Sequence, residues 1–274
     1  MTRGRRRALQ ALVLCLAALS VPAGCERGQA TPAPHEDGLV VFAAASLRDA
    51  FTAIGADFER AHPGVTVTFQ FAGTQELRTQ LEHGAAADVF ASADQRHMDE
   101  LVAASRASEP VVFARNEPVL VVALEAAGRI HGLADLPSAA RLVVGSPEVP
   151  IGRYTQQILE RAAARFGADY RARVEARIVS RELNVRQVLA KVSLGEAEAG
   201  FVYRSDVRAA EDRVSLVTIP AELDVVAEYP IAVVTGAAHP VLARAWVDLV
   251  LSADGARALE RAGFLGPAGR GSEP

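Results

Sequence analysis

Cysteine is almost absent from this sequence of 274 residues: Cys15 and Cys25, both near the N-terminus, are the only two. The chain beyond Cys25 therefore has neither a disulfide nor a cysteine-based metal site. The six histidines are scattered, and none shows the His-x-x-x-His spacing that binds a metal. The sequence also lacks a Gly-x-Ser-x-Gly motif, a phosphate-binding loop and a dinucleotide-binding fingerprint, so it offers no support for catalysis.

Positive charge is scarce as well. Lys191 is the only lysine, and residues 25–274 hold 25 basic side chains against 33 acidic ones, a formal net charge of −8. An acidic body argues against a nucleic-acid partner and against broad electrostatic capture of anions. Any anion site must therefore use backbone dipoles and hydroxyl groups, or one specific arginine.

The N-terminus has the layout of an export signal. Four arginines precede an apolar run from Ala8 to Val21, which is too short to span a bilayer, and small residues follow it. We therefore predict that residues 1–24 are a signal peptide. The segment Pro22-Ala23-Gly24-Cys25 resembles the processing site of bacterial lipoproteins, which implies a lipidated Cys25. Ordinary cleavage near Ala23 is the alternative, whereas the pattern of a twin-arginine signal is missing.

The rest of the chain predicts a tether followed by two α/β lobes. Residues 25–37 are polar and contain two prolines, as expected of a tether between an anchor and a domain. From Leu39 onward, apolar strand runs alternate with helical patterns, which predicts α/β layers with mostly parallel sheets. Two apolar segments, Phe113 to Val122 and Glu228 to Val234, are expected to form a two-strand hinge. The predicted divisions are lobe 1 at 38–116 plus 231–268, lobe 2 at 117–230 and a tail at 269–274.

Four turns in the sequence each follow an apolar strand run and open a helix. A helix N-terminus carries unpaired N–H donors and about half a positive charge, so it binds anions without a cationic side chain. If two α/β sheets face each other, four such ends converge on one point, which predicts a site for a small dehydrated oxyanion. The four turns are Ala44-Ala45-Ser46-Leu47, Ala72-Gly73-Thr74-Gln75, Val149-Pro150-Ile151-Gly152 and Leu183-Asn184-Val185-Arg186.

Each of these positions also has an ordinary structural explanation. Ser46 and Asp49 match the Ser-x-x-acid capping pattern, so Ser46 is first expected to cap its own helix. Thr74 is open to the same two interpretations, and Asn184 has the chemistry of an N-cap. Tyr203 ends an apolar strand, where α/β folds place ligand contacts, and it either donates a hydrogen bond or only lines the cleft.

Three charged residues near the turns are expected to have structural roles. Arg153 lies close to a helix start and is interpreted as a solvated surface residue. Asp88 and Asp94 come nearest to a pair of carboxylates, but we expect them to cap turns and hold the loop after a strand. Neither interpretation supplies an acid–base pair.

Longer segments around the turns carry a family resemblance. They are Val41-Phe42-Ala43-Ala44-Ala45-Ser46-Leu47, Gly73-Thr74-Gln75-Glu76-Leu77, Ala87-Asp88-Val89-Phe90-Ala91-Ser92-Ala93-Asp94, Gly145-Ser146-Pro147-Glu148-Val149-Pro150-Ile151-Gly152-Arg153-Tyr154, Asn184-Val185-Arg186, Gly200-Phe201-Val202-Tyr203-Arg204-Ser205-Asp206 and Tyr229-Pro230-Ile231-Ala232-Val233-Val234. Together, in order from about Leu39 to Phe264, they resemble the molybdate-binding proteins of ABC transporters. The combination is specific, although each segment alone is weak.

The resemblance implies a two-lobed periplasmic-binding-protein fold of type II that holds a tetrahedral oxyanion with neutral donors. Its donors here would be Ser46 and Thr74 through hydroxyl and backbone N–H, Ile151 and Val185 through backbone N–H, and Tyr203 through its phenol. Molybdenum or tungsten would be held only as the oxyanion, without a direct protein–metal ligand or a cofactor. The implied partner is a membrane ABC permease, and the implied state is an exported monomer in the periplasm or cell envelope.

Two departures and three alternatives stay open. The family often has serines where this chain has Gly73-Thr74, and Ile151 is larger than the family's frequent alanine, which leaves the pocket size undecided. A receptor for sulfate or another tetrahedral oxyanion is the alternative within the binding class. An enzyme on the same scaffold lacks a nucleophile or acid–base pair, and the export signal opposes a ligand-sensing domain of a regulator.

Overall fold

The computed structural model describes residues 38–267, which belong to one structural unit, residues 37–274. The predicted signal peptide, Cys25, the tether and the tail from residue 269 lie outside the described residues. Among the helices that are described, none combines the length and apolar character needed to cross a membrane.

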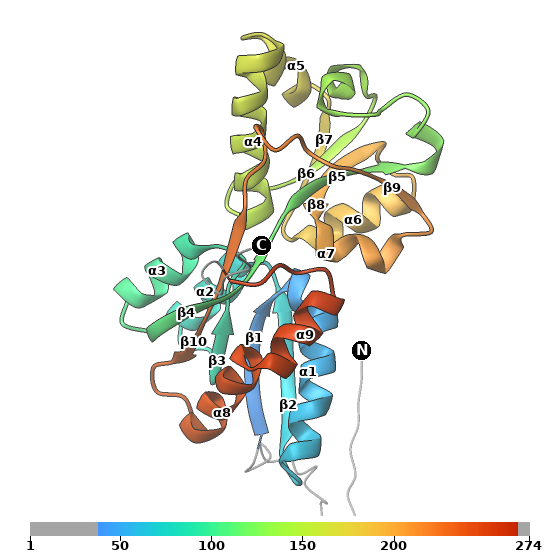
Figure 1. The fold of residues 1–274 in the computed structure, drawn as a ribbon. Coiled ribbons are helices and arrows are strands. Elements are labelled where there is room, and N and C mark those ends of the chain that lie inside the picture. Colours follow the sequence, from blue (N-terminus) through green and yellow to red (C-terminus); the bar gives the residue numbers. More distant parts are fainter. Residues whose placement is uncertain (1–37, 268–274) are drawn as a thin grey trace, which may run out of the picture. The chain divides into compact units, whose positions relative to one another are not determined.

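The first sheet has five strands in the order β2-β1-β3-β10-β4 (Figure 1). Strands β1, β2 and β3 are parallel, and β10 is antiparallel to both of its neighbours, so four of the five strands share one direction. The bounds are β1 (Gly38–Ala44), β2 (Thr66–Ala72), β3 (Val89–Ala91), β4 (Ala107–Asn116) and β10 (Ala227–Val234).

The second sheet repeats this plan in the order β7-β6-β8-β5-β9. Here β5 is the strand that runs against the other four. The bounds are β5 (Pro118–Ala123), β6 (Leu142–Gly145), β7 (Ile178–Glu182), β8 (Ala199–Tyr203) and β9 (Val214–Val217).

The helices fall into two groups that follow the strands of each sheet (Figure 1). With the first sheet are η1 (Ala45–Leu47), α1 (Arg48–Ala61), α2 (Thr74–Glu82), α3 (Gln95–Ala103), α8 (Pro240–Leu251) and α9 (Ala253–Arg261). With the second are η2 (Leu124–Ala126), η3 (Leu133–Ser138), α4 (Pro150–Phe166), α5 (Tyr170–Glu175), α6 (Val185–Ser193), α7 (Arg204–Val207) and η4 (Arg208–Ala210).

Local chemistry explains where the elements begin and end. Strand β1 is a short apolar run whose last four residues are all buried, as expected of a central strand covered on both faces. Helix α4 starts at Pro150, whose missing N–H needs no partner in the first turn, and stops before Gly167, which has a φ of 107°. These features confirm the predicted alternation of strands and helices.

The last two helices return to the first sheet. Helix α8 contacts β10 and α1, and α9 contacts α1 and β4. Trp246 of α8 is fully buried, and its indole packs edge-on against the rings of Phe51, Phe58 and Phe69. This aromatic cluster fixes the C-terminal helices on the first sheet.

The chain passes between the sheets twice. Strand β4 ends at Asn116 in the first sheet and β5 begins at Pro118 in the second, while the chain returns from β9 to β10. Strand β10 already pairs with β4 at Ala227, upstream of the predicted boundary at residue 231. The α/β fold built on two mixed sheets is therefore as predicted in class.

Candidate functional site

A small cavity lies where the ends of both sheets' strands meet helix starts. All five residues predicted as donors, Ser46, Thr74, Ile151, Val185 and Tyr203, are among its lining residues. The remaining lining residues are Ala44, Ala45, Ala72, Gly73, Ala93, Val149, Pro150 and Asn184. The structure therefore brings the four predicted turns and the end of β8 to one place.

The four predicted turns do open helices. Helices η1, α2, α4 and α6 begin at Ala45, Thr74, Pro150 and Val185, each after an extended residue. Of these four, only α6 has a side-chain cap, in which Asn184 Oδ1 accepts a hydrogen bond from the Gln187 N–H at 3.1 Å. No side chain caps the other three, so their first-turn N–H groups keep their capacity to donate to an anion.

Ser46 does not cap its own helix, and the predicted capping pattern with Asp49 is wrong. Neither η1 nor α1 has a side-chain cap, and the Ser46 hydroxyl instead lies 2.9 Å from the Tyr229 hydroxyl. The short helix η1 inserted between the strand and α1 turns Ser46 toward β10. Asp49 is thus released to pair with Arg186, at 2.6 Å.

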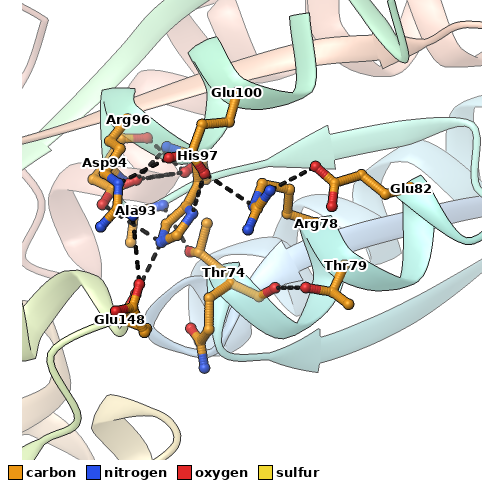
Figure 2. Close-up of polar contacts among 12 residues, drawn as sticks. Thr74, Arg78, Thr79, Glu82, Ala93, Asp94, Arg96, His97, Glu100 and Glu148 are labelled. Atoms are coloured by element: carbon orange, nitrogen blue, oxygen red, sulfur yellow. Dashed lines mark hydrogen bonds and ion pairs between the residues drawn. The ribbon is translucent and has the colours of Figure 1, made fainter. Parts of the chain in front are cut away.

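Thr74 is held by a neighbouring strand end. The N–H of Ala93, which follows β3, donates to Thr74 Oγ1 at 3.1 Å, and Thr74 is only 1% exposed (Figure 2). Because the hydroxyl oxygen accepts this bond, its proton remains for a further acceptor. Ala93 was not predicted as a site residue, although its place after a third parallel strand of the same sheet is the signal for it.

Tyr203 presents a hydroxyl without a partner. The side chain is 1% exposed, and its Oη has no hydrogen-bond partner among the described residues. Burial raises the pKa of the phenol well above its usual value, so the group keeps its proton and remains a donor. A buried polar group without a partner is costly, and this hydroxyl is available to donate a hydrogen bond into the cavity.

The cavity itself is neutral. None of its lining residues is charged. Arg186 directly follows Val185 but is directed away, to Asp49 at 2.6 Å and to the fully buried Asp206 at 2.7 Å. Arg153, predicted to be a surface residue, is partly buried and does not line the cavity.

The buried pair Arg186 and Asp206 joins two parts of the site. Asp206 also accepts the N–H of Tyr203 at 3.2 Å, so the end of β8 is tied to the start of α6. Burial raises the pKa of Asp206 to about 6, although the neighbouring Arg186 acts to lower it. The sequence places Arg186 in a segment that resembles the family but predicts no role for its side chain, and the structure shows its two partners.

Several contacts join the two groups of elements beside the cavity. Gln75 Nε2 donates to the Leu183 carbonyl at 2.8 Å, and His97 Nε2 lies 2.9 Å from the Glu148 carbonyl. Figure 2 shows His97 and Arg96 of α3 directed toward Glu148, with an Arg96–Glu148 distance of 3.4 Å. Together with the pair of Asp49 and Arg186, these contacts hold the two sides of the cavity together.

Gly73 permits the close approach of α2 to the turn that precedes α6. A Cβ on Gly73 would lie 2.3 Å from the Leu183 carbonyl oxygen, a backbone atom that cannot swing aside. Gly73 therefore lets the start of α2 approach the turn before α6.

Of the two aspartates predicted to cap turns, Asp94 does so, whereas Asp88 instead binds backbone N–H groups that are distant along the chain. Asp94 Oδ1 accepts the His97 N–H at 3.0 Å at the start of α3. Asp88 accepts the N–H groups of Val40 and His239, both at 2.8 Å. Within residues 38–267, no cluster of three or more histidine, cysteine, aspartate or glutamate side chains is arranged to hold a metal ion.

Comparisons of the sequence and of the structure with known proteins both find solute-binding proteins. The sequence profile of the bacterial extracellular solute-binding proteins matches residues 39–265. A molybdate-binding protein of Mycobacterium bovis is 41% identical over 252 residues, covering 90% of this chain and 93% of the relative. The structure of the periplasmic molybdate-binding protein of Azotobacter vinelandii has a TM-score of 0.73 at 20% identity, covering 84% of this chain and 99% of its own.

The sulfate-binding protein SubI of Mycobacterium tuberculosis is also similar in structure. Its TM-score is 0.75 at 18% identity, covering 84% of this chain and 87% of its own. At this level of identity the two solved structures show a shared fold and nothing about the ligand.

Proposed function

The chain belongs to the family of bacterial extracellular solute-binding proteins, and from that premise we propose that it captures molybdate, and also tungstate, for uptake by an ABC permease. The observation that carries the proposal is the neutral cavity in which helix starts, hydroxyl groups and the unpartnered Tyr203 phenol converge. The relative from Mycobacterium bovis supports molybdate as the ligand. The proposed role is binding without catalysis.

We assign the oxyanion to five residues. Ser46 and Thr74 donate through hydroxyl and backbone N–H, Ile151 and Val185 through backbone N–H, and Tyr203 through its phenol. A divalent oxyanion that enters this cavity loses its water, which is costly unless donors replace the shell. Fixed neutral donors do this without a countercharge, as helix starts do for phosphate and sulfate groups.

The same donors disfavour an anion that carries a proton, because each of them is proposed to direct an N–H or O–H proton at the ligand. Molybdate, tungstate and sulfate are all unprotonated dianions near neutral pH, so charge does not separate them and cavity size must. Ile151 is the residue we expect to set that size. Sulfate binding is the alternative function on the same fold.

Titration calorimetry tests the proposal directly. Purified protein, stripped of bound anion by unfolding and refolding, is titrated with molybdate, tungstate, sulfate and phosphate. We expect tight binding of molybdate and tungstate and the weakest binding for phosphate. Tight sulfate binding without molybdate binding would replace the proposal by the sulfate alternative.

We further propose how the protein is placed and divided. Residues 1–24 act as the signal, Cys25 is lipidated and residues 25–37 tether a monomer to the membrane that holds the permease. Lobe 1 comprises 38–116 with 231–268 and lobe 2 comprises 117–230; they close around the anion by rotation about the two crossing segments. Replacing Cys25 by alanine should move the protein from the membrane fraction to the soluble fraction. If the parent protein is itself in the soluble fraction, the result would favour an unlipidated product of cleavage near Ala23.

A further inference from the structure

A buried polar network links the crossing between the sheets to Ser46. It contains Asn116 at the end of β4, Tyr229 on β10, Ser46 in η1 and Ser205 in α7, all at most 3% exposed. None of these four residues is charged, and only Ser46 lines the cavity. Because these groups are almost fully buried, the direction of each hydrogen bond matters.

The orientation of Asn116 is fixed by its own backbone neighbour. The Glu117 N–H donates to Asn116 Oδ1 at 3.0 Å, so this atom is the amide oxygen. Asn116 Nδ2, which only donates, then lies 2.7 Å from Ser205 Oγ and 3.5 Å from the Tyr229 hydroxyl.

This orientation of Asn116 determines which hydroxyl donates in the hydrogen bond between Tyr229 and Ser46. The Tyr229 oxygen faces an N–H donor, so its own proton is directed to the other neighbour, Ser46 Oγ, at 2.9 Å. If Ser46 donated instead, the Tyr229 proton would be left facing Asn116 Nδ2, another donor, at a fully buried position where an unpaired proton is costly. Ser46 therefore accepts from Tyr229, and its own proton remains for the cavity.

We propose that Tyr229 and Asn116 are positioning residues that fix the Ser46 hydroxyl as a donor to the bound oxyanion. The inference rests on the proposed function and deepens it, because it gives the selection against protonated anions a structural origin. While the network is intact, Ser46 presents its proton to the ligand and cannot turn to accept one. Without Tyr229, the Ser46 hydroxyl is free to rotate and to accept the proton of an anion such as hydrogen phosphate.

The test compares two tetrahedral dianions of similar size that differ by one proton. At mildly alkaline pH, phosphate carries one proton and sulfate carries none. Affinities of the full protein for molybdate, sulfate and phosphate are measured by calorimetry, with the weaker anions in competition against molybdate. The key quantity is the ratio of sulfate to phosphate affinity.

The variant Tyr229→Phe keeps the ring that packs against Phe113 and Phe264 and removes the hydroxyl. We expect molybdate affinity to fall about tenfold, the scale of one neutral hydrogen bond, and the sulfate-to-phosphate ratio to fall by a similar factor. A merely structural effect lowers all three affinities equally. An unchanged ratio would therefore overturn the proposal even where affinity falls.

Tyr170→Phe is the matched control. Tyr170 is also fully buried, and its hydroxyl donates to the Leu133 carbonyl at 2.5 Å, but it does not line the cavity. We expect it to reduce stability and to leave the ratio unchanged.

Asn116→Asp is a second variant, in which a hydrogen-bond acceptor replaces the amide N–H donor that faces Tyr229. A carboxylate there accepts the Tyr229 proton, so Ser46 donates to Tyr229 and turns a lone pair to the cavity. The added charge repels all three dianions alike, whereas the reversed hydrogen bond lowers the sulfate-to-phosphate ratio further than Tyr229→Phe does. A ratio equal to that of the parent would contradict the proposed positioning of Ser46 by Tyr229 and Asn116. If the parent protein binds none of these anions, the proposed function itself is wrong. If the parent binds them and the ratios do not change in the variants, only the positioning role of Tyr229 and Asn116 is wrong.

Discussion

The two sides of the cavity are built differently. The side from the first sheet offers two hydroxyl groups, those of Ser46 and Thr74, and a hydrogen bond already engages each oxygen. The side from the second sheet offers the starts of α4 and α6, where Ile151 and Val185 have apolar side chains, and the unpartnered hydroxyl of Tyr203. The hydroxyl groups of the first side are thus oriented by the Tyr229 hydroxyl and the Ala93 N–H, and the second side is oriented by backbone geometry and one ion pair behind it.

Because of this difference, substitutions on the two sides should affect the stability of the anion-free protein differently. On the first side, partners in the protein already satisfy the hydroxyl oxygens, so these groups do not lower the stability of the anion-free protein. On the second side, the Tyr203 hydroxyl is unsatisfied until a ligand arrives. Substitutions on the two sides should therefore act alike on anion affinity and oppositely on the stability of the anion-free protein.

The largest effect should come from forcing the two sides apart. In Gly73→Ala the new Cβ would meet the Leu183 carbonyl oxygen at 2.3 Å, so the start of α2 and the turn before α6 must separate. We expect anion affinity to fall by more than about a hundredfold, because donors displaced by an ångström no longer reach the ligand. Gly128→Ala, where nothing lies within 4 Å of the new Cβ, is the matched control in calorimetry. Equal affinities for the two variants would contradict the closed arrangement.

Removing the Ser46 hydroxyl should weaken binding and stability together. Ser46→Ala deletes a donor to the anion and also leaves the buried Tyr229 hydroxyl without its closest partner. We expect binding to weaken by about 1–3 kcal/mol and the free energy of unfolding of the anion-free protein to fall by about 1 kcal/mol. Calorimetry and urea unfolding measure the two quantities. Unchanged affinity would place the site elsewhere.

Tyr203→Phe should lower anion affinity but raise the stability of the anion-free protein. Anion affinity is expected to fall by about 1–3 kcal/mol, while the anion-free protein loses an unsatisfied buried hydroxyl and becomes more stable by up to about 1 kcal/mol. Urea unfolding without and with saturating molybdate reads both effects. A variant that is less stable without anion would indicate that the Tyr203 hydroxyl already has a partner, which would remove the proposed contrast between the sides.

The last effect, which concerns stability and not anion binding, involves the ion pair behind the second side. The pKa of Asp206 is about 6 in the folded protein against an ordinary value of 3.8, so the folded state binds a proton more readily. Its contribution to stability is therefore complete below pH 3.8 and is lost as the pH rises through about 6. The difference in unfolding free energy between the parent and Asp206→Asn, measured by urea unfolding across this range, should decrease and then level off. A constant difference would mean that Asp206 stays ionised throughout.

The local pattern of the sequence was sufficient for the four turns and the strand end that face the cavity, although not for Ala93. Each strand-turn-helix pattern names its own helix start, and the carboxyl ends of parallel strands lie at one edge of a sheet. That rule placed Thr74, Val185 and Tyr203 without any knowledge of tertiary contacts. Their roles as donors remain a proposal.

What the sequence did not reveal depends on partners that are distant along the chain. Ser46 matches a capping pattern, yet it bonds Tyr229, 183 residues away, because the intervening η1 turns it toward β10. Likewise, Arg186 finds Asp49 at a separation of 137 residues, and His97 finds the Glu148 carbonyl at a separation of 51. Local patterns carry no information on such pairs, which depend on how the two sheets meet.

The neutral lining of the cavity has a kinetic consequence. A dianion approaches a body, residues 25–274, whose net charge has the same sign as its own, and no charged side chain lines the cavity to attract it. Dissolved salt screens this repulsion beyond a Debye length of about 10 Å at 0.1 M ionic strength, whereas the dehydrated contacts inside the cavity are hardly screened. Added salt should thus speed capture and leave release unchanged, the reverse of what a receptor that relies on arginine would show.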